Sequence, residues 1–129
     1  MRVLLDTHVL LWALAEEGRL DQATRALLED PETGVFFSAA SIWEIAIKAR
    51  LGRVDFAVRP AEIAHAAREA GFEELPIRSA AAALVAELPL HHRDPFDRIL
   101  VAQAITEPLR LYTADPLLRP YSELVELIG

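Results

Sequence analysis

The stretch Val3-Leu4-Leu5-Asp6-Thr7-His8 is an apolar run that ends in an acid. Three consecutive large aliphatic residues are typical of a strand that is buried on both faces, as in a parallel sheet. A helix is predicted over residues 8–15, directly after this stretch. Because a carboxylate at the end of a buried strand needs a partner to offset its burial, Asp6 is the first candidate functional residue.

Short apolar strands alternate with helices along the rest of the chain. Strands are predicted at Val35-Phe36-Phe37 and Leu111-Tyr112-Thr113, with a short terminal edge strand within residues 124–128. Helices are predicted after Asp21, from Ser38–Ser41 to Gly52, from Pro60 to Gly71, from Ser79, and from Pro95 to about Thr106. This order predicts an α/β fold with a short central, mostly parallel β-sheet flanked by helices on both faces.

The composition is that of a single domain over residues 1–129, since 129 residues with 53% hydrophobic content suffice for one core. The longest apolar runs, Val9–Ala15 and Ala80–Ala86, are far shorter than the roughly 20 residues of a membrane-spanning helix, so no membrane segment is expected. Asp6 and His8 interrupt any signal-peptide pattern, and we expect the N-terminus to be mature. The absence of cysteine suits a reducing compartment and predicts a cytoplasmic protein.

The net charge is −7, with 20 acidic and 13 basic residues. This charge argues against a duplex-DNA binder with a broad basic surface. An acidic protein that acts on nucleic acid needs bound cations or a local basic stripe. The candidate phosphate-binding residues are Lys48, Arg50, Arg53, Arg93 and Arg98. Their alternative role is a solvated helix face, with Glu44 and Lys48 as an i,i+4 pair.

Four acids map to the same edge of the predicted sheet. Asp6 and Asp115 follow strands, whereas Glu44 and Asp97 lie in the first turns of helices. Carboxyl ends of parallel strands and the starts of the following helices share one edge, where ligands usually bind. Carboxylates crowded together repel, and a cation relieves that repulsion. Oxygen ligands without cysteine favour Mg²⁺, with Mn²⁺ as a substitute, over Zn²⁺.

Each acid also has a structural interpretation. Ser41-Ile42-Trp43-Glu44 matches a capping box, and Asp97 could merely complement a helix dipole. Asp115, before Pro116, is also typical of a turn. Asp94 is predicted to be an N-cap, with an auxiliary metal role as the alternative.

The aromatic and histidine residues are less informative. His8 either hydrogen-bonds near Asp6 or serves packing and capping, and His91 and His92 carry little signal because adjacent side chains point different ways. Trp12 and Trp43 are predicted to be core residues.

Four segments together resemble PIN-domain proteins of the VapC toxin type. They are Leu4–His8, Ser38–Lys48, His92–Arg98 and Thr113–Asp115, and the resemblance spans nearly the whole chain. It implies a PIN-like fold and an Mg²⁺-dependent endoribonuclease, the toxin of a toxin–antitoxin pair. Asp6, Glu44, Asp97 and Asp115 would hold the metal, and Thr113 would support the site by hydrogen bonding.

The resemblance also implies a homodimer and a VapB-like antitoxin partner. Metal-activated water would attack a phosphodiester of single-stranded or looped RNA.

Two other classes of function are alternatives to this hypothesis. One is a catalytically silent PIN-like module that binds RNA or protein, which the intact acid set disfavours. The other is a phosphoacceptor domain, which needs a lysine late in the chain, whereas the only lysine is Lys48. Dinucleotide and P-loop enzymes are excluded because the five glycines never cluster into a phosphate-binding loop.

Overall fold

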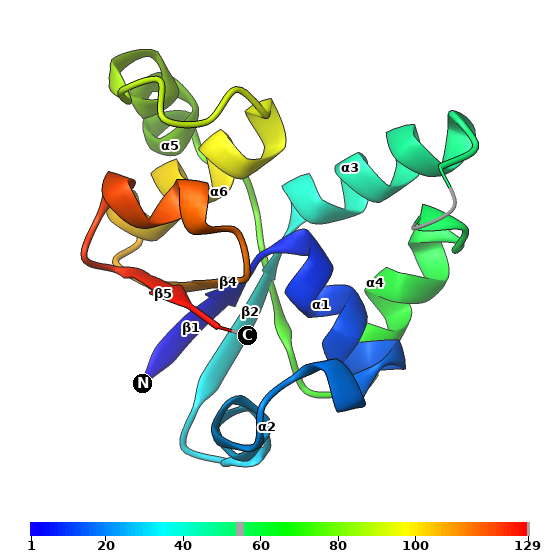
Figure 1. Cartoon of the computed structure of the whole chain (residues 1–129). Coiled ribbons are helices and arrows are strands. Elements are labelled where there is room, and N and C mark those ends of the chain that lie inside the picture. Colours follow the sequence, from blue (N-terminus) through cyan, green and yellow to red (C-terminus); the bar gives the residue numbers. More distant parts are fainter. Residues whose placement is uncertain (54–55, 129) are drawn as a thin grey trace.

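Five parallel strands form one sheet, in the order β3-β2-β1-β4-β5 (Figure 1). The computed structural model describes residues 1–53 and 56–128. The strands are β1 (Arg2–Leu5), β2 (Gly34–Ser38), β3 (Glu73–Leu75), β4 (Arg110–Thr113) and β5 (Val125–Leu127). All four strand pairings are parallel, as the alternation of strands and helices predicts. The terminal edge strand predicted within residues 124–128 is confirmed as β5.

Strand β1 lies at the centre of the sheet, and its side chains alternate between two hydrophobic cores. Val3 and Leu5 pack in one core and Leu4 in the other, all fully buried. Burial on both faces explains why this strand is an unbroken apolar run. Leu5 is in register with Phe37 of β2 and Tyr112 of β4, so the three central strands end at the same edge.

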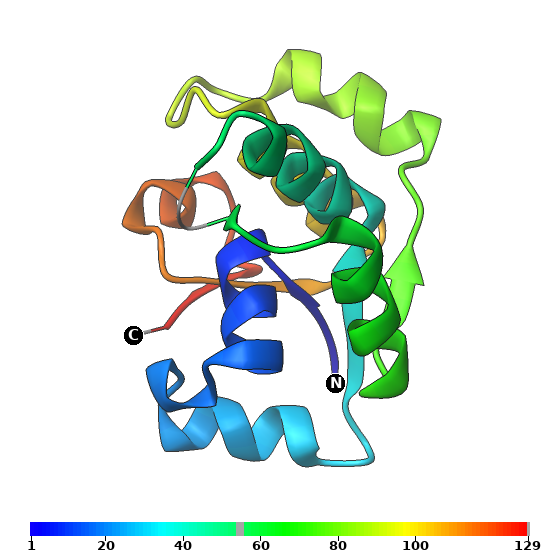
Figure 2. The same cartoon turned by 90° about the vertical axis from the view of Figure 1, so that its right-hand side faces the viewer.

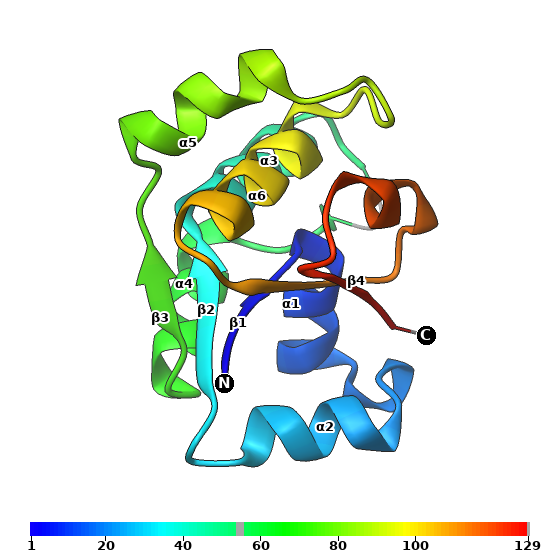
Figure 3. The same ribbon diagram turned by 90° about the vertical axis from the view of Figure 1, so that its left-hand side faces the viewer.

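Helices cover both faces of this sheet. They are α1 (Thr7–Ala15), α2 (Gln22–Glu29), α3 (Ala39–Arg50), α4 (Pro60–Glu69), α5 (Ser79–Leu84) and α6 (Pro95–Thr106), with the 3-10 helices η1 (Glu17–Arg19), η3 (Val85–Glu87) and η4 (Pro116–Tyr121). Figure 2 shows α1 and α4 on one face, and Figure 3 shows α6 on the opposite face. Across residues 1–53 and 56–128, no helix combines the length and apolar character needed to traverse a bilayer.

The strand order reverses at β1. The chain passes from β1 to β2 and β3 on one side, and later to β4 and β5 on the other. In open parallel sheets, ligands bind in the crevice at the carboxyl ends of the strands where the order reverses. Here these strands are β1, which Asp6 follows, and β4, which Asp115 follows two residues later.

Strand β3 is not predicted by the sequence pattern. It pairs with β2 at the edge of the sheet, and among its residues Glu73-Glu74-Leu75 only Leu75 is buried. Exposed acids on an edge strand hinder pairing with other chains. They also remove the apolar periodicity by which a strand is recognised.

Helix α3 begins earlier than the capping-box interpretation requires. Ser38 is the N-cap, and its Oγ accepts a hydrogen bond from the backbone N–H of Ala40. Ser41 lies inside the helix and is buried, so the capping box of Ser41 and Glu44 is wrong.

Of the two tryptophans predicted to be core residues, only one packs against a core. Trp12 is partly buried against the core that contains Val3. Trp43 is 58% exposed and contacts the Phe96 ring edge-on, so its core prediction is wrong.

Candidate active site

Asp6 is fixed at the end of β1 by two hydrogen bonds. Its Oδ1 accepts from the backbone N–H of Val9 at 2.8 Å, which makes Asp6 the N-cap of α1. Its Oδ2 accepts from the hydroxyl of Thr113, at the end of β4. Thr113 Oγ1 in turn accepts from the backbone N–H of Asp115 at 3.0 Å. Thr113 therefore ties the ends of β1 and β4 together.

Glu44 reaches the same edge from α3 and is 2% exposed. Its Oε1 accepts from the hydroxyl of Thr7, and its Oε2 accepts from Nζ of Lys48, one helical turn further on. Thr7 Oγ1 also lies 3.0 Å from Ser41 Oγ. These contacts direct the Glu44 carboxylate toward the start of α1, where Asp6 is the cap.

Asp97 and Asp94 come from the start of α6. Asp94 is the N-cap, as predicted, and its Oδ1 accepts from the backbone N–H of Phe96 at 2.8 Å. Asp97 lies in the first turn, close enough to Asp94, Asp6 and Glu44 for their negative charges to act on it. Acids from the end of β1, from α3 and from α6 thus share one neighbourhood.

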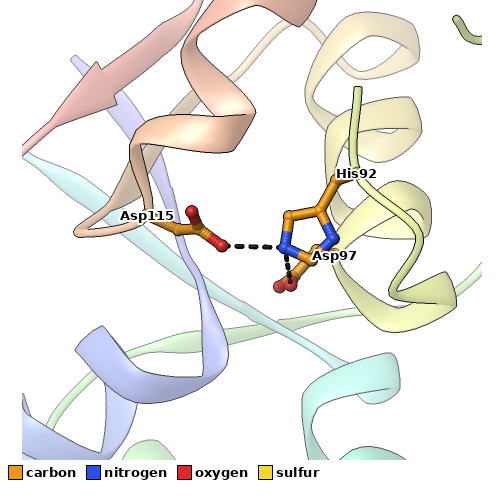
Figure 4. Close-up of side chains that lie close together, drawn as sticks. All are labelled: His92, Asp97 and Asp115. Carbon is orange, nitrogen blue, oxygen red and sulfur yellow. Dashed lines mark hydrogen bonds and ion pairs between the residues drawn. The ribbon is translucent and has the colours of Figure 1, made fainter. Parts of the chain in front are cut away.

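Asp115 joins this neighbourhood through a histidine (Figure 4). His92 Nε2 lies 2.8 Å from Asp115 Oδ2 and 3.3 Å from Asp97 Oδ2. Its Nδ1 accepts from the backbone N–H of Asp94 at 3.0 Å. A neutral ring that accepts at Nδ1 carries its proton on Nε2, so His92 donates toward the two carboxylates and bridges them.

Burial and mutual repulsion make two of these acids hard to ionise. Burial raises the pKa of Asp6 to about 6, against the opposing hydrogen bonds from Thr113 and Val9. Burial, followed by the charges of Asp94, Asp6 and Glu44, raises the pKa of Asp97 to about 7. Near neutral pH, a cation that binds between Asp6 and Asp97 would relieve this cost.

The donor atoms of the cluster suit a hard divalent cation. Asp6 and Asp97 offer carboxylate oxygens, and within the described parts of the chain neither acid forms an ion pair with a lysine or arginine. Mg²⁺ and Mn²⁺ prefer such oxygens. A second group, His92 with Asp97 and Asp115, has potential ligand atoms within 4.8 Å of one another. Because Nε2 of His92 holds the ring proton, we interpret that group as a hydrogen-bonded bridge.

The candidate phosphate-binding residues divide into two sets. Arg50, Arg53 and Arg93 are exposed. Lys48 and Arg98 are occupied inside the protein: Lys48 pairs with Glu44, and Arg98 donates to the carbonyl oxygens of Val85, Leu88 and Pro89 and to the hydroxyl of Tyr121. These contacts give Arg98 a structural role: its side chain holds the loop before α6 in place.

His8 is exposed beside the site and packs against aromatic rings. Its ring lies 5.3 Å from that of Phe56 and 6.2 Å from that of Trp12, between centroids. Its charge lowers the pKa of Asp6, which places it within electrostatic reach of the carboxylate. These ring contacts agree with the packing role that the sequence offers as one alternative for His8.

Two residues of the site were missed by sequence reasoning. Thr7 lies in the Leu4–His8 segment but is given no role there, although its buried hydroxyl donates to Glu44. His92 carries little signal in the sequence because adjacent histidine side chains point different ways. Its place in the His92–Arg98 segment, two residues before the N-cap Asp94, is the signal that could have found it, since the backbone N–H of Asp94 orients the ring.

The parallel α/β fold and the acids at one edge of its sheet are consistent with a nuclease domain, and comparison of the sequence with known families identifies the family. Residues 3–123 match the PIN domain family, so this chain belongs to that family. The chain is 32% identical over 123 residues to Ribonuclease VapC22 of Mycobacterium tuberculosis, with 92% of this chain and 91% of that protein covered. The resemblance to PIN-domain proteins of the VapC type is thereby confirmed.

A solved structure has the same fold. The chain is similar to one chain in the crystal structure of VapBC2 from Rickettsia felis bound to a DNA fragment from their promoter, with a TM-score of 0.71 and 14% sequence identity. The match covers 98% of this chain and 97% of that chain. The prediction of a PIN-like α/β fold is confirmed.

Proposed function

We propose that this protein is a metal-dependent endoribonuclease and the toxin of a VapBC-type toxin–antitoxin pair. The observation that carries the proposal is the set of contacts that links acids from distant segments at the carboxyl edge of the sheet. Thr113 joins Asp6 to the backbone of Asp115, and His92 joins Asp115 to Asp97. Thr7, next to Asp6, holds Glu44. Membership of the PIN domain family and similarity to a protein named a ribonuclease support the same activity.

The residues of the site have separable roles in this proposal. Asp6 and Asp97 hold the divalent ion, Mg²⁺ or Mn²⁺, and Thr113 with the backbone of Val9 orients Asp6. Thr7 holds Glu44 against the start of α1. When bound, the ion supplies an activated water and neutralises charge on the attacked phosphate.

The substrate follows from the charge and shape of this site. Arg50, Arg53 and Arg93 are exposed cations that would hold phosphates of the RNA. Single-stranded or looped RNA suits a site whose acids are buried, because its flexible backbone can bring a phosphodiester into the site.

Removal of divalent ions is expected to stop RNA cleavage. Metal-free protein should leave a mixed RNA pool intact, because nothing then offsets the charge of the acids around the phosphate. Added Mg²⁺ or Mn²⁺ should restore cutting, which gel electrophoresis of the pool measures. Cutting in the presence of excess chelator would contradict the metal requirement. Binding of RNA without turnover in either ion would instead indicate a silent RNA-binding module.

We also propose two protein partners, a VapB-like antitoxin and a second copy of this chain. The similar solved structure is that of VapBC2 from Rickettsia felis bound to a DNA fragment from their promoter, which supports the antitoxin. For the homodimer, the support is a stripe of exposed apolar residues at intervals of four along α3 and its end: Trp43 (58% exposed), Ile47 (37%) and Leu51 (73%). Such a stripe is suited to burial against another protein surface.

Replacement of Ile47 by glutamate is expected to weaken self-association at least about 100-fold, because a carboxylate would be buried at the centre of the stripe. Analytical ultracentrifugation of the wild type and the Ile47→Glu variant over a range of concentrations measures this change. Ala61→Glu, on the exposed start of α4, is the matched control. A wild-type protein that stays monomeric, or equal association of both variants, would contradict the dimer surface.

A further inference from the structure

Lys48 contacts four groups that attract a cation, two carboxylates and two aromatic rings. Its Nζ donates to Glu44 Oε2 and lies 3.6 Å from Asp94 Oδ2. The ammonium also lies 5.0 Å from the centroid of the Phe56 ring and 6.0 Å from that of Phe96. Only 17% of the side chain is exposed. Most lysines move freely in solvent, whereas this one is fixed inside the acidic site.

We propose that Lys48 is a permanent internal cation of this site: it compensates Glu44 and Asp94, so that the site binds a single divalent ion, at Asp6 and Asp97. This inference rests on the proposed function, because it concerns how many ions the nuclease site holds. Lys48 is then a positioning residue that acts through the two carboxylates it contacts.

The contacts divide the acids into two pairs. Glu44 and Asp94 share the Lys48 ammonium. Asp6 and Asp97 form no ion pair with a lysine or arginine anywhere in residues 1–53 and 56–128. Asp6 accepts hydrogen bonds from Thr113 and the backbone N–H of Val9, and Asp97 contacts Nε2 of His92. The second pair therefore lacks the fixed ammonium that the first pair already has.

The electrostatics of Lys48 agree with this division. Burial and the charge of Arg53 lower the pKa of Lys48, but the hydrogen bond and charge of Glu44 and the charge of Asp94 outweigh them and raise that pKa overall. Lys48 thus stays charged in the site.

The fixed ammonium explains why we expect no second ion beside Glu44 and Asp94. Nζ of Lys48 already contacts both carboxylates, and its positive charge would repel a divalent ion there. Without the ammonium, Glu44 and Asp94 would lack the cation that they share, and a second divalent ion would compensate them. Lys48 would thus supply the charge that a second metal ion supplies in two-metal nucleases.

Manganese stoichiometry tests this role without reference to activity. We would titrate the metal-free full chain with Mn²⁺ and count bound ions from the electron paramagnetic resonance signal of free Mn²⁺. The wild type and the charge-retaining Lys48→Arg variant should bind one ion each. Lys48→Gln, which keeps a hydrogen-bond donor but loses the charge, should bind two. The double variant Lys48→Gln/Glu44→Gln should return to one ion.

The outcomes separate this inference from the proposed function. A wild type that binds two ions overturns the inference, whether or not the variants fold. A folded Lys48→Gln variant that binds one ion, with weaker affinity, also overturns it and leaves Lys48 only as a support for Glu44. A wild type that binds no divalent ion overturns the proposed metal-dependent activity itself.

Discussion

Replacement of Asp6 by asparagine is expected to lower the rate of metal-dependent RNA cleavage by a factor on the order of 10³ or more. Asparagine keeps a side-chain oxygen for the backbone N–H of Val9, so α1 retains its cap. It loses the negative charge with which Asp6 would hold the ion. Initial rates on a fixed RNA substrate at saturating Mg²⁺ measure the loss.

Asp21 provides a matched control for this substitution. It is also an N-cap aspartate: its Oδ1 accepts from the backbone N–H of Thr24 at the start of α2, and it is exposed. Asp21→Asn makes the same chemical change at a helix start that carries no acid cluster, and it should cleave RNA at the wild-type rate. Equal cleavage by Asp6→Asn and the wild type would remove Asp6 from the proposed metal site.

The metal-free protein is expected to lose stability as the pH rises from about 4 to about 7. The pKa values of Asp6 and Asp97, about 6 and about 7, lie above the value of 3.8 that an aspartate has ordinarily. Between these pH values the folded chain binds more protons than the unfolded chain, so the free energy of unfolding falls with pH. Asp97→Asn removes one of these groups and should be more stable than the wild type at pH 7.5, by on the order of 2 kcal/mol.

Thermal unfolding in the presence of chelator, from pH 5 to pH 8, measures this effect as a difference of several degrees in melting temperature. The gap between Asp97→Asn and the wild type should widen as the pH rises. Asp30→Asn, an exposed substitution before β2 at the opposite edge of the sheet, should show no such gap. Added Mn²⁺ should raise the melting temperature of the wild type more at pH 7.5 than at pH 5.5, since ions and protons compete for the same oxygens. Parallel curves for Asp97→Asn and the wild type would show that Asp97 ionises normally.

The central strands and the convergence of the acids were accessible from the sequence for one physical reason. Strands β1, β2 and β4 are buried on both faces, so they appear as short apolar runs, and parallel topology brings their carboxyl ends together. Asp6, Glu44 and Asp97 could thus be placed at one edge without any knowledge of contacts. Their hydrogen-bond partners could not, because those depend on rotamers and on packing between distant segments.

The remaining features depend on tertiary structure that local patterns do not encode. β3 is an exposed edge strand with acidic residues, and Trp43 is a large aromatic residue left on the surface. His92 acquires its role only because the loop before α6 is fastened by Arg98 and Tyr121. The sequence predicts the i,i+4 pair of Lys48 with Glu44, which is confirmed, but it does not show that Asp94 from another helix lies beside Lys48.

The position of β1 between β2 and β4 has a consequence during synthesis on the ribosome. Thr113, which donates to the carboxylate of Asp6, is made 107 residues after it, and Asp97 also follows Asp6 at a long distance in the sequence. A growing polypeptide therefore has the first acid long before it has the partners that complete the centre we propose. We expect the nascent chain to have no nuclease activity until Thr113 has been made.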